Sequence, residues 1–308
     1  MINKDIITVD TNFVRPRLDA SHLIIDNDTA AFVDAGTNYS VPYLLESLRE
    51  NNVDVGDVKY VFITHVHLDH AGGAGKLLEH LPNANLVIHP RGAKHLQDPT
   101  KLVASAVGVY GKKIFSDLFG DIRPIPKKRI IIIQDQEIIK MGNRLFSCFY
   151  TEGHARHHYC IFDAASKSVF AGDSFGVSYR EFDSNEGEFI FPSTSPTQFD
   201  PSEAHKAIDK ILSYDPDTVY LTHFSHIQSI ERLALDLHRS IDVFVNIAMD
   251  NKDSTQRTTA IQKAMADYLV EGLSLHKCNF TEKEIKKMLA VDIKVNTMGL
   301  EYWLDTGR

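Results

Sequence analysis

The stretch that decides the fold is YVFITHVHLDHAGG, residues 60–73. It begins with an apolar, β-branched run, which predicts a buried strand over 59–64. Four possible metal ligands follow the strand directly: His65, His67, Asp69 and His70. Imidazole and carboxylate groups are ligands that divalent ions such as zinc prefer. A loop after a strand can aim several such groups at one point, so the sequence predicts a metal site here.

The composition of the chain fits an ordinary soluble globular protein. Its 308 residues are 43% hydrophobic and 24% charged, enough for one large domain with or without an appendage. The formal net charge of −8 argues against nucleic acid or an anionic membrane as the main partner. We therefore expect a small-molecule substrate, no nucleic-acid partner and no membrane association.

The cysteines and the N-terminus favour a cytoplasmic location. The three cysteines, Cys148, Cys160 and Cys278, are far apart and form no CxxC pair. This pattern is typical of reduced residues and not of a disulfide framework. The first residues show no signal-peptide pattern, and no apolar run reaches the ~18 residues that a transmembrane helix needs.

Around the opening stretch, strand patterns alternate with helix patterns. The first half predicts strands at 6–9, 12–14, 22–25, 30–33 and 84–88, with helices after Pro42 and over 71–80. The second half predicts strands at 129–133, 136–140, 144–150, 158–163, 167–171 and 218–221, the last of the chain. A helix is expected after Asp200, its N-cap. This order predicts an α/β (α+β) fold, a four-layer αββα sandwich.

Two segments depart from the alternation. Residues 89–126 hold several prolines around two helix-like pieces, 100–109 and 112–119, and form a helical and loop insertion. Beyond 224 only helical periodicity remains, over 226–249, 253–271 and 281–291, the last with a capping-box start at Thr281. We therefore predict a first domain over 1–224 and a helical C-terminal extension over 225–308.

Three further metal-type donors stand where later strands end. His154 follows the strand at 144–150, Asp173 follows the strand at 167–171, and His223 follows the strand at 218–221. In the predicted sandwich these strand ends meet along one edge with the end of strand 59–64. Together with the first four donors, they give five histidines and two aspartates for one site.

Over residues 5–225 the sequence resembles the metallo-β-lactamase superfamily. The resemblance rests on five motifs in this order: HxHxDH, Gly-Gly, Gly-His, Gly-Asp and a strand-terminal His. The resemblance implies the metallo-β-lactamase sandwich and two divalent metal ions, zinc first, with iron or manganese as alternatives. It implies that one ion is held by His65, His67 and His154, and the second by Asp69, His70 and His223. Asp173 would bridge the two ions.

The resemblance also implies a chemistry for this site. Two ions ~3.5–4 Å apart can share a hydroxide that attacks near neutral pH, because the ions lower its pKa. Asp69 is then the catalytic candidate, as a ligand that also orients the nucleophile or carries its proton. Asp34, in Asp34-Ala35-Gly36, is expected to support a ligating histidine rather than to bind metal.

The remaining histidines receive weaker assignments. His157 and His158 stand where the third motif departs from the common family pattern, and His226 follows the last ligand closely, so their roles stay open. The other seven are interpreted as surface residues or hydrogen-bonded core residues: His22, His80, His89, His95, His205, His238 and His276.

The helical tail narrows the substrate class by resemblance. A helical segment after the last ligand is similar to hydroxyacylglutathione hydrolase (glyoxalase II) and to the quinolone-response thioesterases. We therefore expect a dinuclear hydrolase acting on a thioester or ester bond of a small acyl substrate. The alternatives are a tRNA-processing type of phosphodiesterase or nuclease, an iron-dependent persulfide dioxygenase, and a non-enzymatic role through a partner. Whether the protein forms a homodimer is left open.

Overall fold

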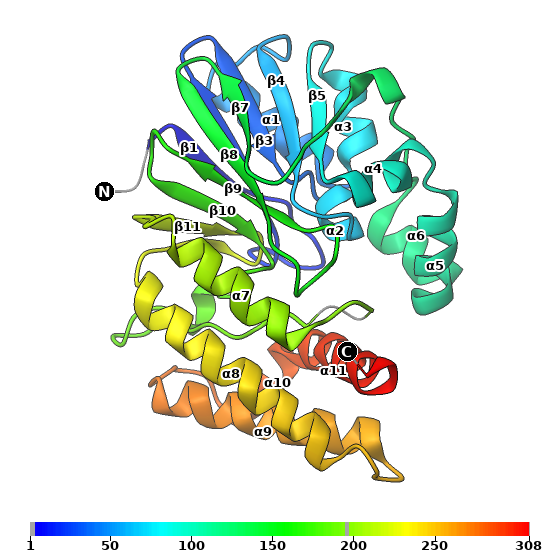
Figure 1. Ribbon diagram of the computed structural model, residues 1–308, viewed down its shortest axis with the longest axis vertical. Coiled ribbons are helices and arrows are strands. Elements are labelled where there is room, and N and C mark those ends of the chain that lie inside the picture. The colour runs from blue at the N-terminus through cyan, green and yellow to red at the C-terminus, as the bar shows by residue number, and fades with distance from the viewer. Residues whose placement is uncertain (1–3, 195–196, 308) are drawn as a thin grey trace. The chain divides into compact units, whose positions relative to one another are not determined.

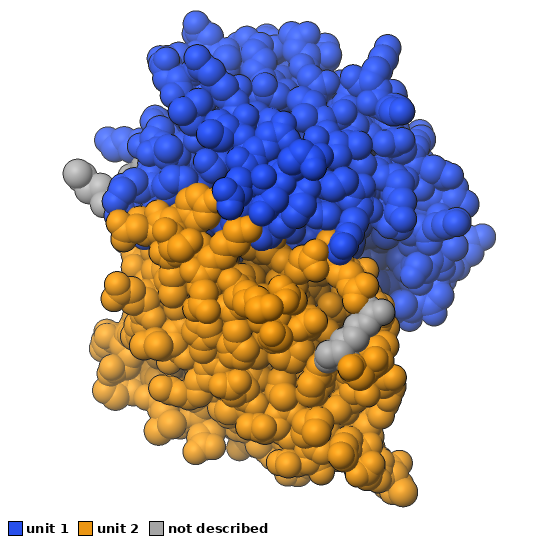
Figure 2. Space-filling view, viewed as in Figure 1, with its two compact units in different colours: residues 1–150, 157–172, 216–226 blue, residues 151–156, 173–215, 227–308 orange. Residues whose placement is uncertain are grey.

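The computed structural model describes residues 4–194 and 197–307. The chain folds into two compact units, shown in separate colours in Figure 2. Unit 1 comprises Met1–Tyr150, His157–Gly172 and Pro216–His226, and unit 2 comprises Thr151–Arg156, Asp173–Asp215 and Ile227–Arg308. The units interleave along the chain, whereas the two domains predicted from the sequence, 1–224 and 225–308, are consecutive. That domain boundary stays a prediction.

Unit 1 is built on two six-stranded sheets within the described residues (Figure 1). The first has the order β1 (Ile6–Asp10), β2 (Ala20–Asp26), β3 (Thr29–Val33), β4 (Val58–Ile63), β5 (Asn85–Ile88) and β6 (Ile130–Ile132). The second has the order β12 (Ser225–Ile227), β11 (Thr218–Leu221), β10 (Ser168–Gly172), β9 (Tyr159–Asp163), β8 (Arg144–Tyr150) and β7 (Glu137–Met141). Both sheets mix parallel and antiparallel pairs.

The predicted strand that leads into the histidine cluster is β4, and its side chains alternate between two cores. Phe62 belongs to the core between the sheets, where its ring lies 5.3 Å from that of Phe146 on β8. Val61 and Ile63 point to the other side, into the core that the sheet shares with the helices. Because β4 is paired in parallel with β3 and β5, both of its faces are buried.

The helices of unit 1 follow the strands. They are α1 (Val41–Glu50), α2 (Leu68–Ala71), α3 (Ala74–His80), α4 (Pro90–Gln97), α5 (Thr100–Tyr110) and α6 (Lys112–Phe119). Leucines of α1 and α3 fill the outer core of the first sheet, including Leu44, Leu48, Leu77 and Leu78. The predicted insertion over 89–126 corresponds to α4, α5 and α6 with their connections.

Unit 2 is mainly helical. Its helices are α7 (Pro201–Leu212), α8 (Ile230–Asp250), α9 (Arg257–Leu275), α10 (Glu282–Met288) and α11 (Ala290–Thr306). The predicted caps are confirmed, because Asp200 accepts a hydrogen bond from the Glu203 backbone N–H and Thr281 forms a capping box with Glu284. The α/β fold with C-terminal helices is therefore confirmed. No described helix is both long enough and apolar enough to cross a membrane.

Three local predictions were wrong. Residues 12–14 form no strand, because the Asp10 carboxylate accepts hydrogen bonds from the backbone of Asn12 and Arg17 and holds a loop. The helix predicted over 71–80 is interrupted: Gly72 and Gly73 separate α2 from α3. The strand at 218–221 is not the last, because β12 follows the final motif and extends the second sheet.

His22, on β2, is a hydrogen-bonded core residue, as predicted. Its side chain is 1% exposed and packs against the rings of Phe170 and Tyr220. Its Nε2 lies 3.1 Å from the Leu221 carbonyl oxygen and its Nδ1 lies 3.3 Å from the Thr8 hydroxyl. Burial lowers the pKa of His22 from 6.5 to about 4, although the Leu221 carbonyl opposes that shift.

This burial predicts an acid-sensitive stability. The unfolded chain takes up the His22 proton near pH 6.5, whereas the folded chain resists it until about pH 4, so stability falls as the pH falls through this window. The contribution is about 3 kcal/mol at most. His22→Gln should flatten the pH dependence of the free energy of unfolding between these values. The exposed-residue control His80→Gln should not, and equal slopes in both variants would contradict the assignment.

Candidate metal centre

The loop after β4 brings two histidines into contact. His65 is buried, and its Nε2 lies 2.8 Å from Nδ1 of His67. The Thr64 hydroxyl lies 3.2 Å from the other ring nitrogen of His65 and fixes the ring. His67 has extended backbone angles at the start of α2. Two ring nitrogens therefore converge within unit 1, as two ligands of one metal ion do.

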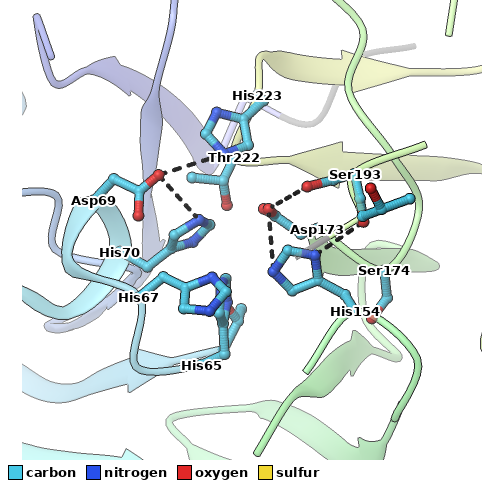
Figure 3. A network of polar contacts seen from close by, with 12 residues as sticks. His65, His67, Asp69, His70, His154, Asp173, Ser174, Ser193, Thr222 and His223 are labelled. Carbon is cyan, nitrogen blue, oxygen red and sulfur yellow. Dashed lines mark hydrogen bonds and ion pairs between the residues drawn. The ribbon is translucent and has the colours of Figure 1, made fainter. Parts of the chain in front are cut away.

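A second group in unit 1 consists of Asp69, His70 and His223. One ligand atom from each lies within 4.8 Å of the others. Asp69 Oδ2 is 3.9 Å from His70 Nε2 and 3.8 Å from His223 Nε2 (Figure 3). The short helix α2 presents Asp69 and His70, whereas His223 follows β11, so residues distant in sequence meet at the carboxyl ends of the strands.

Asp34 supports this group from behind. It is buried at the end of β3 with a φ of +60°. Its carboxylate accepts hydrogen bonds from the Thr64 backbone N–H at 2.9 Å and from the Thr222 hydroxyl at 2.9 Å. Its Oδ2 lies 2.7 Å from His70 Nδ1, which leaves Nε2 of that ring toward Asp69 and His223. Asp34 thus supports a histidine of the group, as the sequence predicted.

Asp19 supports His223 in the same way, and sequence reasoning missed it. Its fully buried carboxylate lies 2.8 Å from His223 Nδ1, and the Leu18 carbonyl oxygen lies 3.2 Å from the same nitrogen. Burial raises the pKa of Asp19 to about 6, while His223 acts to lower it. A lone aspartate before strand β2 carries no motif. Only the contact between chain segments more than 200 residues apart reveals its role.

Unit 2 holds the other two predicted ligands, His154 and Asp173. Both are buried, and His154 Nε2 lies 3.5 Å from Asp173 Oδ2. Ser193 links the pair: its carbonyl oxygen is 3.0 Å from His154 Nδ1, and its hydroxyl donates to Asp173 at 3.0 Å (Figure 3). Ser193 therefore orients both side chains of this pair within unit 2.

Beside this pair, unit 2 contains a pocket with a mainly apolar lining. Helices α7 and α8 supply most of its apolar side chains, and the segment before α7 supplies the rest. The lining residues are His154, Asp173, Ser174, Gly176, Pro192, Ser193, Phe199, Ala204, Ala207, Ile208, Leu237 and Ile241. Apolar side chains therefore lie directly beside the two predicted metal ligands.

The insertion over 89–126 packs onto the start of α2. Leu68 belongs to an apolar cluster with Phe115 and Phe119 of α6 and with Ile122. Tyr110, at the end of α5, is partly exposed; burial raises its pKa to about 12, and Asp69 adds to that rise. The insertion is thus tied to the residues that present Asp69 and His70.

The three histidines whose roles were left open also lie in unit 1. His157 Nδ1 accepts a hydrogen bond from the Val66 backbone N–H at 3.4 Å. The ring of His158 is buried 4.9 Å from that of His65. His226 is half-buried, with its Nδ1 3.2 Å from the Ser225 hydroxyl and its ring beside Tyr220. The first two therefore pack around the loop of His65.

The donor set fits divalent metal ions of the zinc type. It offers imidazole and carboxylate groups, which suit zinc, iron and manganese. For four of the histidines, one ring nitrogen contacts an oxygen: His65 contacts the Thr64 hydroxyl, His70 contacts Asp34, His223 contacts Asp19 and His154 contacts the Ser193 carbonyl. Such contacts orient ligating imidazoles and are typical of metal centres.

Comparison with known proteins agrees with these features. Residues 15–223 match the metallo-beta-lactamase superfamily. A metallo-beta-lactamase fold-containing protein of Sulfurisphaera tokodaii is 22% identical over 68% of this chain and 73% of its own length. A hydroxyacylglutathione hydrolase of Francisella tularensis subsp. novicida is 26% identical over 68% of this chain and 74% of its own length. In further relatives of that name, the match covers about half of the protein.

The fold is also similar to that of solved structures. A metallo-beta-lactamase family protein from Thermus thermophilus superposes with a TM-score of 0.67 at 16% identity, covering 100% of this chain and 95% of that one. At this identity the similarity concerns the fold alone.

The Asp19–His223 contact predicts a loss of metal affinity on substitution. Asp19→Asn keeps an oxygen near His223 but removes the charge that strengthens the ligand. Metal affinity, measured by competition with a chromophoric chelator, should fall by about 10–100-fold. The metal-free protein should keep its fold, because an amide is easier to bury than a carboxylate. Affinity equal to that of the exposed control Asp28→Asn would contradict the assignment.

Proposed function

Because the chain belongs to the metallo-β-lactamase superfamily, we propose that it is a dinuclear metal-dependent hydrolase that cleaves a thioester or ester bond of a small acyl substrate. The observation that carries the proposal is the convergence of Asp69, His70 and His223, whose ligand atoms lie within 4.8 Å of one another. Both imidazoles of this group are contacted on their other nitrogen, His70 by Asp34 and His223 by Asp19. Such contacts behind imidazoles are typical of metal-binding histidines, which supports the proposal.

We propose that the two sets of ligands hold two ions in one centre. His65, His67 and His154 would hold one, Asp69, His70 and His223 the other, and Asp173 would bridge them. Chain connectivity supports this assignment. Asp173 directly follows the last residue of β10, and His154 lies in the short link between the paired strands β8 and β9. Both ligands are therefore tethered closely to strands of unit 1.

When bound, two divalent ions would lower the pKa of a water molecule and polarise the substrate carbonyl group. The residues of the chain have separate tasks. The side chain of Asp69 is 26% exposed, more than those of His70 and His223. The Asp69 carboxylate can therefore orient the attacking water and accept the proton of that water. Asp34 and Asp19 hold the rings of His70 and His223 in place. Asp173 is fixed by the hydroxyl of Ser193.

Three observations support the choice of an acyl substrate. The pocket beside His154 and Asp173 is lined mainly by apolar side chains, including Phe199, Ile208 and Leu237, which favour an apolar part of a substrate over a charged one. The net charge of −8 opposes the binding of a polyanion. Relatives named hydroxyacylglutathione hydrolase agree with this choice.

We further propose that zinc is the resident metal and that the protein acts in the cytoplasm.

A hydrolysis screen tests the proposal. The metal-loaded protein would be offered acyl-thioesters, esters, lactones, phosphodiesters and β-lactams, with the bound metal identified in parallel. We expect turnover of a thioester or ester that is lost on chelation. The Asp173→Ala substitution should lower the rate of this hydrolysis by more than about 100-fold. It removes a proposed metal ligand, whereas the loss of a residue that only contacts a ligand costs less. The exposed control Asp253→Ala should keep the rate.

Two outcomes would overturn the substrate assignment. Phosphodiester cleavage without thioester or ester cleavage would indicate the nuclease class. Inertness toward every hydrolytic substrate, with oxygen uptake on a persulfide, would indicate an iron-dependent dioxygenase. A full rate in Asp173→Ala would contradict the bridging role.

A further inference from the structure

Two histidines of unit 2, far from the ligands in sequence, face each other across a helix pair. His205 lies on α7 and His238 lies on α8, which pack side by side (Figure 1). Their Nδ1 atoms are 2.6 Å apart, and their ring planes differ by 5°. Stacked rings cannot approach closer than about 3.5 Å. The two rings therefore meet edge to edge, with their nitrogens aimed at each other.

The second nitrogen of each ring contacts an aspartate of the opposite helix. His205 Nε2 lies 3.2 Å from Asp242 Oδ1, and His238 Nε2 lies 3.3 Å from Asp209 Oδ1. Each helix carries its histidine and aspartate four residues apart, and thus on one face. The antiparallel register sets the histidine of each helix opposite the aspartate of the other. The four side chains form one continuous row, from Asp242 through the two rings to Asp209.

This row decides which ring nitrogens carry hydrogen. An ionised carboxylate can only accept hydrogen bonds, so each Nε2 facing an aspartate is assigned as the donor. A neutral imidazole with hydrogen on Nε2 has a lone pair on Nδ1. Two lone pairs aimed at each other over 2.6 Å repel unless a cation lies between them. A proton or a metal ion can take that place.

We propose that His205 and His238 bind a divalent transition-metal ion, such as zinc or copper(II), through their Nδ1 atoms. Imidazole nitrogen suits both metals. Carboxylates on the far side of ligating imidazoles orient the rings, and Asp209 and Asp242 are placed to do so. The two negative charges also balance those of a divalent ion.

The ion fits after a small side-chain movement. Zinc binds imidazole nitrogen at ~2.0–2.1 Å, so a tetrahedral ion needs the two nitrogens about 3.3 Å apart. Both rings are partly exposed, with 28% of His205 and 25% of His238 accessible, which leaves room for the rings to turn and for water to complete the coordination. The bound ion would cross-link α7 to α8.

Metal counting in matched variants tests the proposal. The 308-residue chain would be loaded with its resident metal, equilibrated with micromolar Zn²⁺ and analysed for metal per chain. His205→Ala and His238→Ala should each bind one zinc fewer than the unchanged protein. The control His80→Ala, which removes an exposed histidine at the end of α3, should bind as many as the unchanged protein. Asp242→Asn should weaken this zinc by about 10-fold.

A spectroscopic measurement makes the test independent of the zinc count. Cu²⁺ added to the metal-loaded protein should give an electron paramagnetic resonance spectrum with coupling to two histidine nitrogens, which His205→Gln and His238→Gln each remove. Equal zinc in all variants, or a copper spectrum unchanged by both glutamine variants, would overturn the proposal. Because each result is a difference between variants, it does not depend on whether the chain is a hydrolase.

Discussion

The contacts of the buried Asp34 carboxylate are the interactions on which the rest of unit 1 depends. It stands at the end of β3 and accepts hydrogen bonds from Thr64, after β4, and from Thr222, after β11. It thereby joins strand ends of both sheets, and its contact with His70 orients a predicted metal ligand. Hydrogen bonds to a charged group contribute roughly 1.5–3 kcal/mol each. The same buried carboxylate therefore supports both the fold of unit 1 and the candidate metal site.

The sequence predicts those parts of the site that lie in short motifs at strand ends. His65, His67, Asp69 and His70 form one cluster, and each later donor ends an apolar run, so the period-two strand pattern locates all seven candidates. The strand alternation also predicts the two sheets. These features are local, because each depends on side chains within a few residues of one another.

The features that sequence reasoning missed depend on contacts between distant segments. A role for Asp19 follows only from its contact with His223, and a role for His205 only from its contact with His238 on another helix. The loop after β1 looked like a strand because its apolar residues, Phe13 and Val14, suggested one; the hydrogen bonds of Asp10 decided otherwise. Helix α11 was missed because its apolar residues are not confined to one face, and three of its buried positions are Asn296, Thr297 and Gly299.

The proposed function depends on the proposal that ligands from both units hold two metal ions in one centre. Anomalous X-ray scattering at the metal edge, from crystals of the metal-loaded protein, tests it most directly. We expect two peaks about 3.5–4 Å apart, one contacted by His65, His67 and His154 and the other by Asp69, His70 and His223, with Asp173 between them. A single peak on Asp69, His70 and His223, with His154 and Asp173 away from any metal, would contradict it.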